Sequence, residues 1–154
     1  MQHIDEACGI LRKEVATESK YAGVAVVDPY FGVLLQRQTG MPVDEELEYY
    51  FSGMLPERCP KPWASVDRVL APWNLKDNHW VAVEIDLAEW TVHVSDPDTR
   101  LTPERHLPGL LKPITHTLPP LMDGHQELHA KHAGKLPQPF KYNRVKGIPQ
   151  NKQS

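Results

Sequence analysis

Residues 79–96 read HWVAVEIDLAEWTVHVSD, and this stretch decides the fold. Residues 80–87 are apolar, β-branched and partly alternating, as in a β-strand, and residues 89–95 repeat the pattern. The gap between the two segments is so short that we expect them to pair as an antiparallel hairpin. Asp96 and Pro97 then end the second strand, because proline cannot continue a ladder of hydrogen bonds.

The two ends of this hairpin carry a histidine and an aspartate. His79 precedes the first strand and Asp96 follows the second. In an antiparallel pair the start of one strand lies beside the end of the next, so we expect the two side chains to be neighbours. A carboxylate beside an imidazole fixes its tautomer and stabilises the imidazolium, which is the base half of a nucleophilic triad. The alternative is a pair that only caps the hairpin.

The chain before the hairpin shows two helical patterns and one apolar segment. Residues 3–18 repeat apolar side chains at helical spacing, and residues 44–51 suit a short helix capped by Asp44. Residues 23–35 are apolar and β-branched but contain Asp28-Pro29, which indicates a strand or a loop packed on the core.

After the hairpin the periodicity fades. Residues 107–114 and 118–122 are short apolar pieces interrupted by prolines, and residues 124–134 read as a solvated helix or loop. Residues 140–146 have a weak strand character. Most of the 15 prolines lie after Pro97, so we expect a compact first two-thirds and a looser last third.

Composition bounds the class of protein. The chain has 154 residues, enough for one domain, and 40% of them are hydrophobic. A formal net charge of −3 gives no global argument for binding nucleic acid or an anionic membrane. No apolar run reaches the length of a membrane span, and the polar start is unlike a signal peptide. Two cysteines without paired spacing predict a reducing compartment, nuclear or cytoplasmic.

The residues around the hairpin resemble a known family. Asn74, His79, Trp80 and Asp96 match the pattern of the Ulp-type SUMO proteases, and more closely the plant Ulp-like domains of transposon-derived proteins. The resemblance extends over nearly the whole chain. It implies an α+β, papain-like (adenain/Ulp-type) cysteine protease fold over residues 1–154, with a small, mostly antiparallel sheet and flanking helices.

The same resemblance implies roles for individual residues. His79 would be the general base, Asp96 would orient it, and Trp80 would line the channel for the C-terminal glycines of a ubiquitin-like (SUMO-type) modifier. Residues 144–151 resemble the run that supplies an oxyanion-hole glutamine; Gln150 matches it, and Asn151 competes. The implied enzyme is a monomer that hydrolyses amide or isopeptide bonds and needs no metal or organic cofactor.

The nucleophile is the point of departure from the family. The family's Asp-Cys-Gly motif is expected where the sequence reaches Ser154, so we expect a protease domain that lacks its catalytic-cysteine segment and is inactive by itself. Cys8 and Cys59 both precede His79, which does not fit the family's order of His, Asp and Cys. Two alternatives stay open: a non-catalytic binder of a ubiquitin-like modifier, and a transposon-derived remnant.

Two further groups of side chains have structural interpretations. His125, His129 and His132 could share a helical face, but no fourth ligand is evident, so we expect a solvated stretch rather than a metal site. The remaining tryptophans do not form a regular stripe, and we expect them to pack in the core: Trp63, Trp73 and Trp90.

Overall fold

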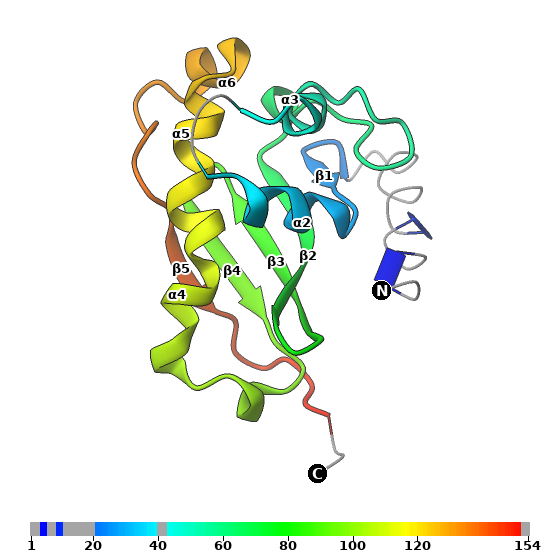
Figure 1. The fold of residues 1–154 in the computed structure, drawn as a ribbon, viewed down its shortest axis with the longest axis vertical. Coiled ribbons are helices and arrows are strands. Elements are labelled where there is room, and N and C mark those ends of the chain that lie inside the picture. Colours follow the sequence, from blue (N-terminus) through cyan, green and yellow to red (C-terminus); the bar gives the residue numbers. More distant parts are fainter. Residues whose placement is uncertain (1–3, 6–8, 11–20, 40–42, 152–154) are drawn as a thin grey trace.

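A computed structural model describes residues 4–5, 9–10, 21–39 and 43–151, and it shows one mixed β-sheet with helices packed on one face (Figure 1). The α+β class predicted from the sequence is confirmed. The elements follow in the order β1 (Val24–Val26), α2 (Tyr30–Arg37), α3 (Glu45–Ser52), β2 (Arg68–Lys76), β3 (His79–Asp86), β4 (Thr91–Ser95), α4 (Leu107–Lys112), α5 (Leu118–Asp123), α6 (Gln126–Lys131) and β5 (Lys141–Arg144).

The sheet has the strand order β1-β2-β3-β4-β5. Its centre is antiparallel, because β3 pairs with β2 on one side and with β4 on the other. Both outer pairings, β1 with β2 and β4 with β5, are parallel. The predicted hairpin is therefore confirmed and forms the centre of the sheet, and the weak strand predicted over residues 140–146 is its β5 edge.

Strand β2 is an element that the sequence patterns did not reveal. It joins β3 through a two-residue turn, Asp77 and Asn78, which both have positive φ (51° and 62°). Paired positive φ values are typical of a type I′ hairpin turn, where Asp and Asn are favoured. Asp77-Asn78 between two apolar runs was thus the local signal for this strand.

Pro72 lies inside β2 and does not remove a backbone hydrogen bond from the sheet. The carbonyl of Leu70, two residues earlier, accepts a hydrogen bond from the N–H of Val27, so it points toward β1. Pro72 has the same orientation because strand residues alternate with period two. Since β1 pairs only as far as Leu70, the N–H that proline lacks would have had no partner there.

The proline-rich last third forms a long helical rod rather than a looser region, so that prediction was wrong. Helix α4, a π-helical stretch (Pro113–Thr117) and α5 follow one another without a gap, and α6 adds a further turn. The rod packs against the sheet and supplies a large share of the core, with these side chains buried: Leu107, Leu111, Ile114, Leu118, Leu121, Met122 and Leu128.

Partners outside the rod explain how it accommodates its prolines. Pro119 has no N–H to donate to the carbonyl of Thr115, and the N–H of Phe140 donates to that carbonyl instead (2.9 Å). In α4, just before the π-helical stretch, the carbonyl of Leu110 accepts a hydrogen bond from Trp73 Nε1 (3.1 Å). The carbonyl that Pro119 leaves without a donor thus ties the rod to the residue before β5, and the Leu110 carbonyl ties it to β2.

The segments before β2 match their predictions in part. Helix α3 begins after Asp44, whose side chain accepts from the N–H of Glu46 (2.8 Å), so the predicted cap is confirmed. Residues 23–35 contain both a strand, β1, and the start of a helix, α2. The helix predicted over residues 3–18 lies mostly outside the described residues.

The two faces of the sheet differ. The face under the helices holds the main core, which includes all three tryptophans predicted to be buried: Trp63, Trp73 and Trp90. The opposite face is apolar near β1 and β2, where Val26, Leu70 and Pro72 line a hollow of about 340 Å³. Within the described part of the chain, no helix has the length and apolar character needed to cross a membrane.

Candidate active site

His79 and Asp96 meet at the end of the β3–β4 hairpin, as the spacing predicted. Nε2 of His79 lies 2.8 Å from Oδ1 of Asp96, and the side chains are 8% and 0% exposed. The distance is that of a hydrogen bond, although the ring N–H is not aligned on the oxygen. With Nε2 facing the carboxylate, Nδ1 is the ring nitrogen left to accept a proton.

The loop that follows β4 fixes the Asp96 carboxylate. Its Oδ1 also accepts a hydrogen bond from the N–H of Asp98 (2.8 Å), which closes a tight turn around Pro97. Its Oδ2 is buried and has no hydrogen-bond partner among the described residues. The carboxylate therefore has a fixed orientation and an acceptor position to spare for a positively charged imidazole.

Asp98 and Arg100 form a second layer that the sequence patterns did not single out. Nε and Nη2 of Arg100 donate to the two carboxylate oxygens of Asp98, at 2.9 and 3.0 Å. These hydrogen bonds, together with the charges of Arg100 and His79, hold the pKa of the Asp98 carboxyl below its usual range. A second negative charge thus stands near the imidazole. The Asp-Pro-Asp sequence, typical of a turn, was its only local signal.

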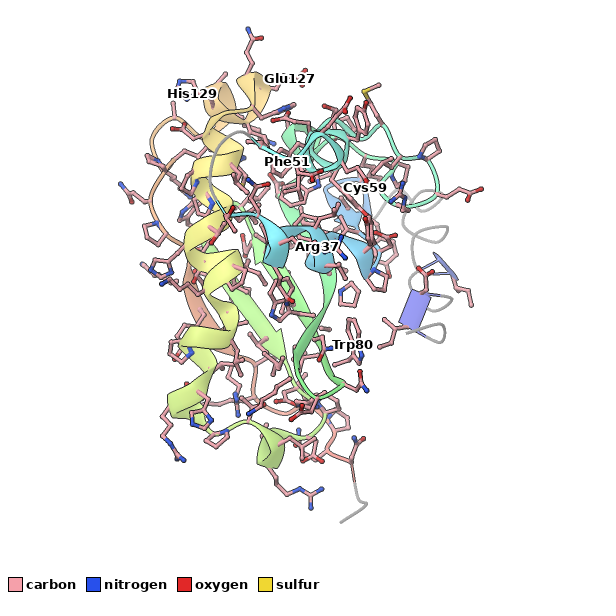
Figure 2. The ribbon with its side chains drawn as sticks, in the orientation of Figure 1. Arg37, Phe51, Cys59, Trp80, Glu127 and His129 are labelled. Atoms are coloured by element: carbon pink, nitrogen blue, oxygen red, sulfur yellow. The ribbon has the colours of Figure 1, made fainter. Side chains whose placement is uncertain are left out.

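Trp80 points away from His79. Successive residues of a strand face opposite sides of the sheet, so His79 is buried under the helices and Trp80 lies on the open face. The indole lines the 340 Å³ hollow and also a smaller one of about 180 Å³, which it shares with Gly32 of α2 and Asn74 of β2. Figure 2 shows Trp80 beside the lower part of the β2–β3 hairpin.

Gln150 lies beside the pair, but its side chain is already engaged. Its Nε2 donates to the carbonyls of Asp96 (2.8 Å) and Ile148 (3.0 Å). Its Oε1 accepts from the N–H of Thr99 (2.9 Å). The structure thus brings Gln150 to the site, while its predicted role as an oxyanion donor stays a prediction.

The competing residue, Asn151, contacts the same loop through its backbone. Its N–H donates to the carbonyl of Pro97 (2.7 Å). The choice between Gln150 and Asn151 for the oxyanion role therefore also stays open.

Cys59, the cysteine among the described residues, does not lie beside His79. Cys59 is fully buried next to α3, where its Sγ lies 3.6 Å from the carbonyl oxygen of Tyr50 and 3.5 Å from that of Lys61. Figure 2 shows Cys59 near α3, well apart from Trp80 and the β2–β3 turn. Cys8 lies outside the described residues. Cys59 is thus a structural residue of the core.

The three histidines of the α6 region have separate partners. His125 Nδ1 lies 2.9 Å from Glu48 Oε2, and His129 Nδ1 lies 2.7 Å from Asp123 Oδ1. His132 is buried against the ring of Trp90, with 5.6 Å between ring centroids. Nowhere in the described ranges do three or more His, Cys, Asp or Glu side chains gather where they could hold a metal ion.

The sequence matches a family described as the Ulp1 protease family, C-terminal catalytic domain, over residues 2–154. The chain belongs to the Ulp1 protease family. The match covers the β3–β4 hairpin with His79 and Asp96 as well as the residues around Gln150.

Solved structures of this family share the fold. The C-terminal Ulp1 protease domain in complex with Smt3, the yeast orthologue of SUMO, superposes with a TM-score of 0.60 at 16% identity, over 97% of this chain and 57% of that one. The SUMO protease Ulp1 with its catalytic cysteine oxidised to a sulfenic acid gives 0.59 at 14% identity, over 97% and 57%.

At such identities the similarity concerns the fold. The chain spans a little over half the length of these structures. No curated protein matches the sequence.

Proposed function

We propose that the chain carries the general-base half of a cysteine peptidase that cleaves the amide or isopeptide bond behind the C-terminus of a ubiquitin-like modifier of the SUMO type. The observation that carries the proposal is the buried contact of His79 with Asp96, 2.8 Å, at the end of the β3–β4 hairpin. Membership of the Ulp1 protease family supports the reaction class. The yeast Ulp1 domain, solved in complex with Smt3, supports the class of modifier.

Each residue of the pair has one role in the proposed reaction. His79 accepts the proton of a cysteine thiol through Nδ1, and the thiolate attacks the carbonyl carbon of the modifier's last residue. As the C–N bond breaks, His79 returns the proton to the leaving amine, and water then hydrolyses the thioester. Asp96 holds the ring through Nε2 and stabilises its charged form.

The thiol of the proposed enzyme lies outside the described residues, because Cys59 is buried in the core near α3. In the same proposal Trp80 takes the C-terminal segment of the modifier. Its half-buried indole and the apolar hollow beside it suit a narrow, extended peptide with small side chains.

The proposal is tested with a fluorogenic amide of a SUMO-type modifier. The chain is expressed with any residues that its reading frame encodes after Ser154, and hydrolysis is expected where these supply the thiol. His79→Ala should abolish it, while Gln126→Ala, an exposed change on α6, should leave it unchanged. Hydrolysis that survives His79→Ala would exclude this base.

Residues 1–154 alone provide the second arm of the test. They should neither hydrolyse the substrate nor react with a vinyl-sulfone derivative of the modifier. Turnover by residues 1–154 that disappears on Cys59→Ala would overturn the assignment of the thiol.

A non-catalytic binder of the modifier is the second candidate. It is favoured by the apolar hollow beside Trp80, which exists without any thiol near His79 among the described residues. Titration of residues 1–154 with a SUMO-type modifier, followed by calorimetry, separates the two functions. Binding that Trp80→Ala weakens, without hydrolysis by the longer chain, would favour the binder.

A further inference from the structure

Gln150 joins the two ends of the loop that carries the Asp96 carboxylate. Its Nε2 donates to the carbonyl of Asp96, at the end of β4, and its Oε1 accepts from the N–H of Thr99, three residues later. The Thr99 hydroxyl lies 3.3 Å from the same Oε1. One side chain therefore connects the two ends of a loop whose residues lie at least 51 positions before it in the sequence.

The backbone around Gln150 reinforces this bridge. After β5, the N–H of Val145 donates to the carbonyl of Val94 (2.8 Å), so the chain continues along β4. The N–H of Asn151 then donates to the carbonyl of Pro97 (2.7 Å), between the two loop ends that Gln150 holds. The segment 145–151 thus follows β4 and the loop as far as the site.

Counting hydrogen-bond groups shows what the side chain can do in this arrangement. A glutamine amide has two N–H donors and one carbonyl acceptor. Both donors contact carbonyls, those of Asp96 and Ile148, and the acceptor contacts Thr99. No N–H is left to stabilise an oxyanion unless one of these contacts is released.

We propose that Gln150 is a positioning residue for the His79–Asp96 pair. It fixes the carbonyl of Asp96 and the N–H of Thr99, and between them lies Asp98, whose N–H holds Oδ1 of Asp96. The chain of contacts from Gln150 through the loop to the carboxylate sets the orientation of the acceptor that faces the imidazole. The catalytic consequence rests on the proposed function, but the positioning itself does not.

Two variants of residues 1–154 separate the contacts. Gln150→Met keeps the length of the side chain and removes every polar group. Gln150→Glu keeps an oxygen for Thr99 and removes both donors to the carbonyls of Asp96 and Ile148. Gln126→Ala, on the exposed surface of α6, is the matched control at the other end of the molecule.

Nuclear magnetic resonance provides readouts that do not need turnover. The first is the ¹⁵N and proton shift of the His79 ring at Nε2, which reports the contact with Asp96. The second is amide hydrogen exchange at Asp98 and Thr99. Gln150→Met should move the ring signal and speed exchange at both amides by about tenfold, the effect of losing roughly one hydrogen bond. Gln150→Glu should move the ring signal while exchange at Thr99 stays slow.

One result would overturn the positioning role of Gln150. A ring signal that stays at its position in both Gln150 variants, as in the control, would overturn the proposal even if Thr99 exchanges faster. Gln150 would then brace the loop without orienting the pair. If Gln150→Met lost its signal dispersion by unfolding, the Gln150→Glu ring signal alone would decide. Since neither readout involves hydrolysis, an inactive protein does not affect the result.

Discussion

Two histidine–carboxylate pairs of this chain have nearly the same distance and different surroundings. His79 lies 2.8 Å from Asp96, and His125 lies 2.9 Å from Glu48. The carboxylate of the first pair is 0% exposed, whereas that of the second is 35% exposed. Distance alone therefore does not distinguish the two pairs, whereas the burial of the carboxylate does.

The elements that carry the pairs explain the difference. His79 and Asp96 flank neighbouring strands of the sheet, and the turn around Pro97 fixes the carboxylate. Glu48 stands on α3, and His125 precedes α6 at the rim of the helical layer. The first pair is set by the sheet, while the second joins two helical segments and has one partner, Glu48, that is about one-third exposed.

Activity is where we expect the two pairs to differ most. In the proposed peptidase, Asp96→Asn should lower kcat for the fluorogenic amide by roughly 10³- to 10⁴-fold. The imidazole of His79 then loses the group that sets its tautomer and stabilises its charge. Glu48→Gln is the matched change in the other pair and should leave kcat unchanged. Steady-state kinetics with the fluorogenic amide measures both. An equal loss in the two variants would mean that damage to the fold, rather than the role of the pair, lowers the rate.

Stability should show the next largest effect. Asp96→Ala removes the carboxylate beside the buried His79 ring and the acceptor of the Asp98 N–H, so the free energy of unfolding should fall by about 3 kcal/mol. Urea unfolding followed by tryptophan fluorescence measures the change. A decrease of less than about 1 kcal/mol in the free energy of unfolding would show that water solvates the site more than its burial indicates.

The pair could be predicted from the sequence because its determinants are local. Two strand patterns with a short gap specify a hairpin, and a hairpin specifies that His79 and Asp96 are neighbours. Residues farther along were not predictable in this way. The position of Gln150 depends on a parallel pairing of β5 with β4, which no local pattern reveals.

The prolines misled the prediction for the last third of the chain. Proline removes a backbone donor, which predicts a break in a helix. Here Phe140 and Trp73 donate to rod carbonyls from outside the helix, and a π-helical stretch accommodates Pro113. Such partners come from the tertiary structure, so the local sequence of such a helix does not predict it.

A histidine with no hydrogen bond to a carboxylate sharpens the comparison: the charge of Asp67 raises the pKa of His132 only as the weakest of the effects that act on it. Burial, helped by the nearby charges of Lys131 and Lys135, lowers the pKa of His132, and its Nε2 has no hydrogen-bond partner among the described residues. The fold therefore favours the neutral ring. Its contribution to stability is fully present above the unfolded pKa of about 6.5, and it is lost as the pH falls from there through the lower pKa of the folded state.

His132→Leu tests this contribution, because leucine keeps an apolar side chain against Trp90 and does not titrate. Between pH 7.5 and pH 5 the Tm of the original protein should fall by roughly 2 °C more than that of the variant. Thermal unfolding at a series of pH values measures the difference. If the two curves stay parallel over this range, His132 is free to protonate in the folded protein.

The smallest effect should come from the second pair itself. Glu48 is about one-third exposed, so water already solvates part of its carboxylate and weakens its interaction with His125. Exposed ion pairs contribute about 0.2–1 kcal/mol, and salt screens them. Glu48→Ala should therefore lower the free energy of unfolding by less than about 1 kcal/mol, with a smaller difference at 1 M NaCl than at 0.1 M. Urea unfolding at the two salt concentrations measures it. A salt-independent loss as large as that of Asp96→Ala would mean that exposure does not separate the two pairs, and the assignment of His79 and Asp96 would then rest on family membership alone.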